Sequence, residues 1–192
     1  MSKAISNKNV ADAKFAPAPF DGPFKAALGR PELKGSWLIF GKSGSGKTTF
    51  ALQLAKYLTR FVDKVAFDSL EQGLSLSMQK AWKRVDMAAA GSKVIFLDKE
   101  SLPELRDRLS KRKSPNVIII DSVICLVGMR LADYQKLMND YPNKLFIFLA
   151  HEDDRGNPSP ALAEKIRKLS DIKMHVEGYK VFTTTRLSLI HI

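Results

Sequence analysis

The stretch Gly41-Lys42-Ser43-Gly44-Ser45-Gly46-Lys47-Thr48 constrains the rest of the chain, because it satisfies the phosphate-loop pattern G-x-x-x-x-G-K-[ST] at every fixed position. An apolar run at 36–40 precedes this stretch and predicts a buried strand. Apolar residues at helical spacing follow it over 48–58 and predict a helix. Strand, glycine-rich loop and helix form the context in which this pattern binds phosphate, so the context favours a phosphate-binding loop over a chance match in a glycine-rich turn.

The residue types in the loop indicate the ligand. Glycines let the backbone curl so that successive N–H groups point at one anion, and the following helix adds the positive end of its dipole. Lys47 can place its ammonium on the β- and γ-phosphates, and the Thr48 hydroxyl can ligate Mg²⁺. We therefore expect ATP and Mg²⁺ as ligands, with the nucleotide bound by Gly41, Lys42, Ser43, Gly44, Ser45, Gly46, Lys47, Thr48 and Thr49.

The composition is that of one globular domain. The chain has 192 residues, of which 45% are hydrophobic and 27% are charged, and this length is enough for a sizeable core. No apolar run approaches the roughly 20 residues of a membrane span, and the first residues lack the apolar stretch of a signal peptide. We expect no membrane partner and a cytoplasmic location. Cys125, the single cysteine, lies among apolar residues and predicts a buried thiol, so no disulfide or zinc framework is expected.

The charge of the chain favours a polyanionic partner. The formal net charge is +11 and the isoelectric point is near 9.8. Such a balance is typical of proteins that bind nucleic acid, and we expect single-stranded DNA as a partner. The alternative is that the charge serves only solubility and attraction to the nucleotide itself.

The rest of the chain alternates between the patterns of strands and helices. Residues 1–19 are polar and basic and predict a flexible arm, and residues 20–192 predict a single domain. Alternation on both sides of Gly178 predicts a terminal hairpin. A parallel sheet with helices on both faces, a three-layer α/β/α fold, accounts for this order. The expected strands lie at 36–40, 64–68, 94–97, 116–122, 144–150, 172–177 and 179–186, and the expected helices at 48–58, 74–85, 101–113, 131–141 and 161–169, with a loop at 87–92.

Two acidic residues follow strands of this sheet, where parallel sheets bind ligands. Asp121 ends the most apolar strand and is expected to hold Mg²⁺, directly or through water; the alternative is a cap or turn residue. Glu71 follows the second strand and could orient and deprotonate a water in line with the γ-phosphate. Asp68 is the alternative base, and a solvated loop glutamate is the alternative interpretation of Glu71.

Three basic or neutral side chains complete the expected site. His151 follows the last apolar strand, where it could sense the γ-phosphate, or it could be a structural histidine. Arg186 and Lys180 lie on the terminal hairpin and could act in trans on a neighbour's nucleotide, as arginine fingers do. Ordinary solvated strand charges are the alternative for both.

With these residues in place, the chain resembles the RecA-like ATPases, the class that includes RecA, RadA and KaiC, over about residues 35–187. The run Val117-Ile118-Ile119-Ile120-Asp121-Ser122 is similar to the Walker B strand of RecA, and Ser69-Leu70-Glu71 resembles the strand end that carries the catalytic glutamate. An extra strand at 94–97 lies between the two in sequence. The resemblance implies Lys47 and Thr48 at phosphate and magnesium, Asp121 at the metal, Glu71 as base, His151 in the sensor position and Arg186 near the trans-acting basic residues.

Within this class the match looks closest to small phage or mobile-element ATPases, including the Sak-type recombination proteins. The segments 15–18 and 24–27 both fit the pattern F-x-x-A, by which RecA-like recombinases dock on the next subunit, so the resemblance implies a homo-oligomer. RecA usually has glutamine or asparagine where this chain has His151, and the first DNA-binding loop would be short or absent. These departures count against strand exchange and leave ATP binding intact.

Three functions are compatible with these patterns. The first is an ATPase that oligomerises and acts on single-stranded DNA in phage-type recombination or replication. Its DNA surfaces would be the basic stretches 106–113 and 165–173 and the loop 152–160, each of which could equally be a solvated surface. The second is a small-molecule or nucleotide kinase, for which the loop 152–160, with a lone Arg155, is the candidate lid. The third is a regulatory ATP-binding module with little hydrolysis.

Overall fold

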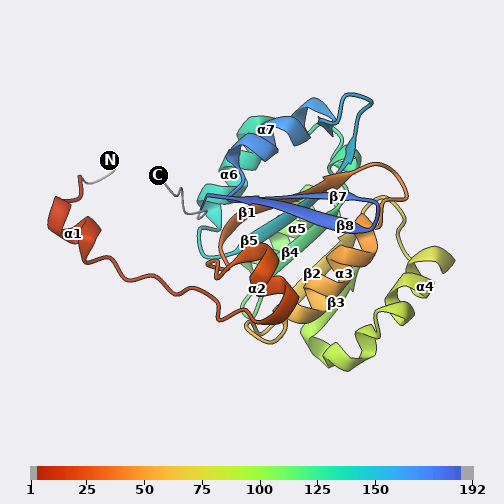
Figure 1. Cartoon of the computed structure of the whole chain (residues 1–192), viewed down its shortest axis with the longest axis horizontal. Helices are drawn as coiled ribbons and strands as arrows, with labels where there is room; N and C mark the ends of the chain where they lie inside the picture. The colour runs from red at the N-terminus through yellow and green to blue at the C-terminus, as the bar shows by residue number, and fades with distance from the viewer. Residues whose placement is uncertain (1–3, 187–192) are drawn as a thin grey trace.

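One sheet runs through the middle of the molecule, and helices cover both of its faces (Figure 1). The structure is a computed structural model that describes residues 4–186. The strand order is β3-β2-β4-β5-β1-β7-β8, and β6 pairs with β5. The pairings along β3, β2, β4, β5, β1 and β7 are parallel, whereas β6 and β8 run antiparallel to their neighbours. The strands are β1 (Gly35–Gly41), β2 (Val65–Ser69), β3 (Val94–Leu97), β4 (Val117–Asp121), β5 (Leu145–Glu152), β6 (Pro158–Ser159), β7 (Ile172–Glu177) and β8 (Lys180–Thr185).

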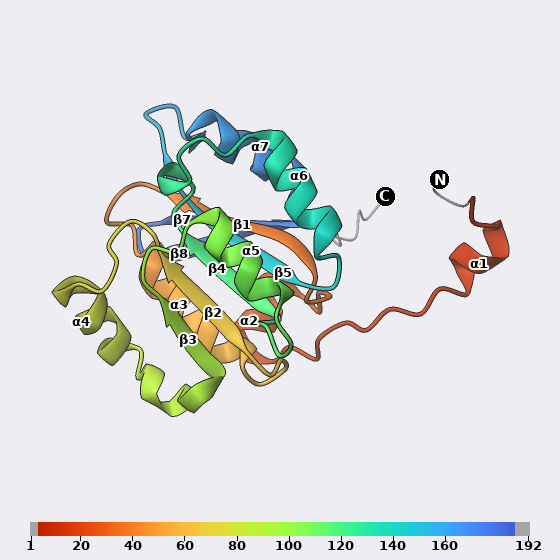
Figure 2. The same cartoon turned by 180° about the vertical axis from the view of Figure 1, so that it is seen from behind.

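The helices divide between the two faces of the sheet. Helices α2, α3 and α4 cover one face, and α5, α6 and α7 cover the other, as Figures 1 and 2 show from opposite sides. This arrangement is the expected α/β/α fold, and the antiparallel pair β7–β8 is the expected hairpin. The helices are α1 (Asn7–Ala11), α2 (Gly22–Leu28), α3 (Lys47–Leu58), α4 (Leu76–Arg84), α5 (Leu102–Ser110), α6 (Leu131–Asp140) and α7 (Ala161–Leu169), with short 3₁₀ helices η1 (Met87–Lys93) and η2 (Val123–Cys125).

Side chains of the central strands point alternately to the two faces of the sheet, where they form two hydrophobic cores. Every residue of β4 is buried, which explains its continuous β-branched sequence. Ile119 packs in the core beneath α3, whereas Ile118 and Ile120 pack in the core beneath α5 and α6. Because successive residues of a strand point to opposite faces, the same alternation determines which face a polar residue at a strand end can reach.

Several local expectations need correction. Helix α1 forms inside the expected arm; Ser6 caps it and none of its residues is buried. Ala18 is already buried, so the packed core begins before residue 20, while the flexibility of the arm stays a prediction. The expected loop at 87–92 is the 3₁₀ helix η1, in which Met87 is buried. Cys125, which lies in η2, is only half-buried, so the expectation of a buried thiol is wrong.

Candidate functional site

The phosphate loop joins β1 to α3, as its sequence context predicts. Gly46 is the N-cap of α3 with φ +100°, a conformation that suits glycine, and an added Cβ would lie 3.1 Å from the Tyr179 ring. Lys47 is 7% exposed, and its Nζ donates to the carbonyl oxygens of Gly41 at 2.9 Å and Lys42 at 2.8 Å. Burial lowers the pKa of Lys47, and nearby carboxylates, first that of Asp121, oppose this shift. The ammonium therefore lies inside the loop, held by carbonyl oxygens of the loop.

A hydroxyl and a carboxylate meet directly behind this loop. Thr48 Oγ1, at the start of α3, donates to Oδ2 of Asp121 at 3.0 Å. Asp121 ends β4 and is 3% exposed. Burial raises the pKa of Asp121 to about 6, against the opposing hydrogen bond from Thr48. The pair thus presents two oxygen atoms of the kind that Mg²⁺ prefers, at the position that the sequence predicts.

Glu71 lies beside this pair and is fixed from two strands. Its backbone N–H donates to the carbonyl oxygen of Asp121 at 2.9 Å, which ties the end of β2 to the end of β4. Its Oε2 accepts from Ser122 Oγ at 3.2 Å and lies 2.9 Å from His151 Nε2. The side chain of Glu71 is 38% exposed, so a water molecule can reach it. The structure therefore brings Glu71, Asp121 and His151 together.

His151 lies in β5 itself, whereas the sequence places it just after a strand ending at residue 150. Its register partner in β1 is Gly41, the first residue of the phosphate loop. The strand continues through Glu152 because β6 pairs with its last two residues. His151 therefore stands between the phosphate loop and Glu71, a position from which it can respond to both.

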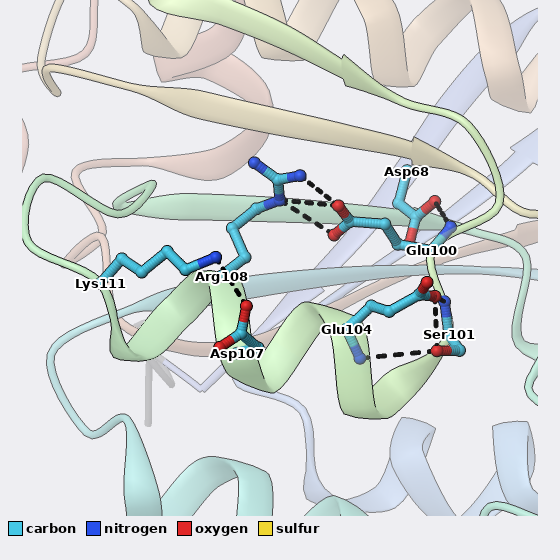
Figure 3. A network of polar contacts seen from close by, with 7 residues as sticks. All are labelled: Asp68, Glu100, Ser101, Glu104, Asp107, Arg108 and Lys111. Atoms are coloured by element: carbon cyan, nitrogen blue, oxygen red, sulfur yellow. Dashed lines mark hydrogen bonds and ion pairs between the residues drawn. The ribbon is translucent and has the colours of Figure 1, made fainter.

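Asp68 faces the other side of the sheet (Figure 3). It is 1% exposed, and its Oδ1 accepts the backbone N–H of Glu100 at 3.2 Å. Burial raises the pKa of Asp68 to about 7, and the carboxylate of Glu100, itself paired with Arg108, adds to this shift. Asp68 is a neighbour of Glu71 in sequence but points away from Thr48 and Asp121. Geometry therefore excludes it as the alternative base.

The two basic residues of the hairpin lie at opposite ends of it. Lys180 pairs in register with Glu177, at the end of β7 nearest the phosphate loop. Arg186 follows β8 at the far end, where it donates to the Leu169 carbonyl oxygen at 2.8 Å and pairs with Asp171 at 3.3 Å. The structure thus does not place Arg186 in the site of its own chain, and its action in trans stays a prediction.

Five of the nine basic side chains in the two stretches expected to contact DNA form ion pairs among residues 4–186. On α5, ion pairs join basic side chains to acidic partners on α5, on α6 or just before α5. On α7, two basic side chains share one glutamate. Much of the positive charge of these stretches is therefore compensated before any partner binds. The pairs are Arg106–Asp140 at 2.8 Å, Arg108–Glu100, Lys111–Asp107 at 2.6 Å, Arg167–Glu164 at 2.8 Å and Lys168–Glu164 at 3.6 Å.

The two F-x-x-A segments have different environments. Phe24, in α2, stacks on Tyr57 with ring centroids 4.2 Å apart and on Phe50 at 6.3 Å, so the segment 24–27 belongs to the chain's own core. Phe15 is 68% exposed, with the Lys34 ammonium 5.7 Å from its ring centroid. Of the two segments, 15–18 is therefore the one whose phenylalanine is exposed.

Sequence reasoning missed part of the polar shell around the loop. Ser122 enters the sequence argument as part of the run that resembles the Walker B strand, with no role of its own, yet its hydroxyl donates to Glu71. Glu152 Oε2 lies 2.6 Å from His175 Nε2, and the charge of Glu152 acts on the pKa of Lys47. The residues of this second pair come from β5 and β7, which are separated by β1 in the sheet. No sequence spacing could have signalled that contact.

A glycine loop on a helix N-terminus, a buried lysine, and a threonine–aspartate pair across two elements define a phosphate-loop nucleoside-triphosphatase site. The family model described as the ATPase family associated with various cellular activities (AAA) matches residues 37–172, and the chain belongs to this family. Within it, the sheet order and terminal hairpin make the fold RecA-like.

Known proteins with related sequence or structure include a DNA repair and recombination protein and two proteins of the same fold. The DNA repair and recombination protein RadB of Methanosphaera stadtmanae is 31% identical over 102 residues, which are 50% of this chain and 44% of RadB. The chain therefore matches less than half the length of that relative. Two solved structures share the fold at low identity. They are the flagellar accessory protein FlaH from Methanocaldococcus jannaschii (TM-score 0.61, 16% identity, 86% of this chain and 84% of that one) and a KaiC-like protein from Pyrococcus horikoshii OT3 (0.56, 18%, 90% and 88%).

The helices of the molecule are short and amphipathic or only partly apolar. Within residues 4–186, none of them combines the length and apolar character that a membrane crossing requires.

Proposed function

We propose that the chain hydrolyses ATP in a Mg²⁺-dependent reaction. The observation that carries this proposal is the convergence of Lys47, the Thr48–Asp121 pair and Glu71 at one edge of the sheet, from three different strands or their following turns. Each group matches one requirement of phosphoryl transfer: charge on the phosphates, oxygen ligands for the metal, and a base for water.

The residues present fit a nucleotide and its metal. Ser45 Oγ, in the loop, and Ser69 Oγ, at the end of β2, are buried without a hydrogen-bond partner among the described residues, and phosphate oxygens or metal-bound water would satisfy such groups. In the part of the chain that the structure describes, no three His, Cys, Asp or Glu side chains gather into a metal site. Mg²⁺ characteristically uses one or two carboxylates together with substrate phosphates, so Thr48 and Asp121 suffice as its protein ligands.

The roles of the chain's own groups follow from their positions. Lys47 would exchange its carbonyl contacts for the β- and γ-phosphates and neutralise their charge. Bound Mg²⁺ would supply further charge neutralisation at the same phosphates. Glu71, oriented by Ser122 and His151, would hold the attacking water and accept its proton. His151 would register loss of the γ-phosphate through its contact with Glu71.

We also propose that the ATPase self-associates and binds single-stranded DNA, in phage-type recombination or replication. The net charge of +11 supports a polyanionic partner, and the name of the RadB relative supports a role in DNA repair and recombination. The exposed Phe15 offers an anchor for a neighbouring subunit. For a basic residue acting in trans, Lys180 is better placed than Arg186, which is paired with Asp171 at the far end of the hairpin.

ATP turnover and sedimentation velocity, with and without single-stranded DNA, test the proposal. The variants are Lys47→Ala, which removes the phosphate charge, and Glu71→Gln, which removes the base while keeping a hydrogen-bonding side chain. We expect Lys47→Ala to lose turnover and the rise in melting temperature on adding Mg-ATP. We expect Glu71→Gln to keep that rise but to lose roughly 10²-fold or more in turnover. Unchanged turnover in Glu71→Gln would contradict the assignment and favour a regulatory ATP-binding module.

A further inference from the structure

Helix α4 carries a basic face whose charges have no acidic partner in the part of the chain that the structure describes. Lys80, Lys83 and Arg84 are exposed and lie within five residues of one another. In the range 4–186 none of the three has a hydrogen bond or ion pair to another side chain, and α4 contains no acidic residue of its own. At about 3.6 residues per turn, positions 76, 80, 83 and 84 lie on the same side of the helix. The charges therefore form one continuous face.

This face differs from the basic stretches of α5 and α7. Arg106, Arg108 and Lys111 are each paired with an acidic residue, and so are Arg167 and Lys168. The basic side chains of these stretches that have no ion pair among residues 4–186 are Arg112, Lys113, Lys165 and Lys173. In α4, by contrast, every basic side chain of the exposed face is unpaired within that same range. Side chains held in such pairs must break them, or share them, before they can bind a phosphate group. The basic side chains of α4 need break no such pairs, so they can contact phosphates directly and displace the counterions condensed on a polyanion.

The opposite side of α4 anchors the helix firmly to the domain. Met78 is 1% exposed, and Trp82 packs edge-on against Phe67 and Phe96 with centroid distances of 6.4 and 5.6 Å. Figures 1 and 2 both show α4 at the periphery, outside α3. The basic face is consequently presented outward by a helix whose position is fixed by the core.

Two exposed leucines extend this face toward the ATP site. Leu74 is 75% exposed and Leu76 is 66% exposed, at the end of α4 nearest Glu71. A positively charged track with adjoining apolar side chains suits a single strand, whose phosphates and unstacked bases are both accessible. Duplex DNA offers its phosphates but keeps its bases stacked.

The segment between Glu71 and α4 is tied together by hydrogen bonds. Ser77 Oγ, in the first turn of α4, donates to Gln72 Oε1 at 2.8 Å, and Gln72 is the residue after Glu71. The Gly73 N–H donates to the Ser69 carbonyl oxygen at 2.9 Å, and the Leu74 N–H donates to Asp98 Oδ1 at 2.9 Å. A ligand bound to the basic face of α4 is thus connected to Glu71 through the short segment 71–77, which these hydrogen bonds hold in place.

We propose that Lys80, Lys83 and Arg84, together with Leu74 and Leu76, bind the backbone and bases of single-stranded DNA. This α4 surface takes the place of the stretches 106–113 and 165–173 as the main DNA contact. The inference rests on the DNA-binding part of the proposed function and adds a location to it. Binding there would also change the position of Glu71, so DNA would alter ATP turnover through the segment 71–77.

Fluorescence anisotropy with a labelled oligo-dT strand tests this surface in the full-length chain. The variant is the triple Lys80→Gln, Lys83→Gln, Arg84→Gln. Its matched control is Lys111→Gln, Arg112→Gln, Lys113→Gln, which also removes two lysines and one arginine from exposed positions. Each phosphate contact contributes about 0.7 to the slope of log affinity against log salt concentration for single strands. We expect the α4 triple to lower this slope by about 2 and to weaken binding about 10²-fold at 0.1 M salt. The control should stay within about twofold of wild type.

The outcomes separate this inference from the proposed ATPase activity. Basal ATP turnover without DNA should remain within about twofold of wild type in both triples, since neither touches the ATP site. Equal losses of DNA affinity in both triples would indicate diffuse attraction by net charge, and loss in the control alone would place the contact on the basic segment 111–113 that follows α5. Either result overturns the α4 surface. Failure of the wild type to bind oligo-dT would overturn both this surface and the DNA-binding part of the proposed function, while its ATP turnover would still be judged by Lys47→Ala.

Discussion

Asp68 and Asp121 occupy nearly equivalent positions on neighbouring strands, yet they have different surroundings. Each is buried near the carboxyl end of its strand, and burial raises the pKa of each, to about 7 and about 6 respectively. Ser69 is the register partner of Asp121, so Asp68 is one residue short of that position and points to the other face. One residue of offset therefore separates the carboxylate that we propose as a metal ligand from a carboxylate that faces the backbone of Glu100.

The partners of the two carboxylates reflect this difference. Asp121 meets the hydroxyl of Thr48 and lies close enough to Lys47 and Glu71 for their charges to act on its pKa. Asp68 meets the backbone of Glu100, which Arg108 neutralises in turn (Figure 3). Both residues have a raised pKa, so the pKa alone does not tell a functional carboxylate from a structural one. The groups around each carboxylate do, because only Asp121 lies beside a hydroxyl and a lysine of the phosphate-binding loop and helix.

The largest expected effect separates the two residues by activity. Asp121→Asn removes the charge of the proposed metal ligand, and we expect ATP turnover to fall by roughly 10²–10³-fold. Asp68→Asn acts on the opposite face of the sheet, and we expect turnover to stay within about threefold of wild type. Steady-state ATPase assays at saturating Mg²⁺ measure both. A comparable loss in Asp68→Asn, in protein that melts cooperatively, would contradict the assignment of faces.

The pH dependence of stability gives a smaller effect than the loss of turnover, and here Asp68 rather than Asp121 has the larger share. Both folded-state pKa values lie above the ordinary value of 3.8, so folding favours the protonated forms. Their stabilising effect is present below about pH 4 and is lost as the pH rises through 6 and 7. Between pH 5 and pH 7 we expect Asp68 to cost about 2 kcal/mol of unfolding free energy and Asp121 about 1 kcal/mol. Urea denaturation of wild type and Asp68→Asn at pH 5 and pH 7 measures this difference. The loss of unfolding free energy between the two pH values should be smaller in the variant by the contribution of Asp68.

Mg-ATP should change the contribution of Asp121 to the pH dependence of stability and leave that of Asp68 unchanged. A bound metal favours the ionised form of its ligand, so it should suppress the pH-dependent loss that comes from Asp121 and leave that from Asp68. Thermal melts of Asp68→Asn with and without Mg-ATP at pH 5 and pH 7 report on the Asp121 share alone. Stabilisation by Mg-ATP that is the same at both pH values would argue against Asp121 as the metal ligand.

Local signals in the sequence predicted the parts of this contrast that lie within one element. The phosphate-loop pattern predicted the loop and α3, and the β-branched run before Asp121 predicted β4. Local signals could not predict the register between β2 and β4, which alone decides that Asp68 and Asp121 face opposite sides. They also could not predict that Arg106 pairs with Asp140, 34 residues away, so the charge of that stretch looked free. Contacts between distant elements are the part that a single sequence leaves open.

The smallest expected effect concerns the helix that supports the Asp68 side. Ser101 caps α5: its hydroxyl accepts the Glu104 N–H at 3.5 Å, and Glu104 Oε2 accepts the Ser101 N–H at 2.8 Å. This capping box follows directly after Glu100, so it helps to hold the Asp68 network in place (Figure 3). Ser101→Ala should lower the unfolding free energy by about 1 kcal/mol, because one orphan N–H at the start of the helix loses its acceptor. Urea denaturation at pH 7 measures this loss.

Turnover in the same variant then sharpens the distinction between the two faces. The Asp121 side receives none of its hydrogen bonds from α5 within the described residues, so Ser101→Ala should leave ATP turnover within about twofold of wild type while it destabilises the fold. Ser110→Ala, at the other end of α5, is a matched control, since its hydroxyl donates to the Asp107 carbonyl oxygen at 2.7 Å and caps no N–H group among residues 4–186. A tenfold loss of turnover in Ser101→Ala alone would mean that the Asp68 network acts on Glu71 through the end of β2, and Asp68 would then be a positioning residue for the reaction.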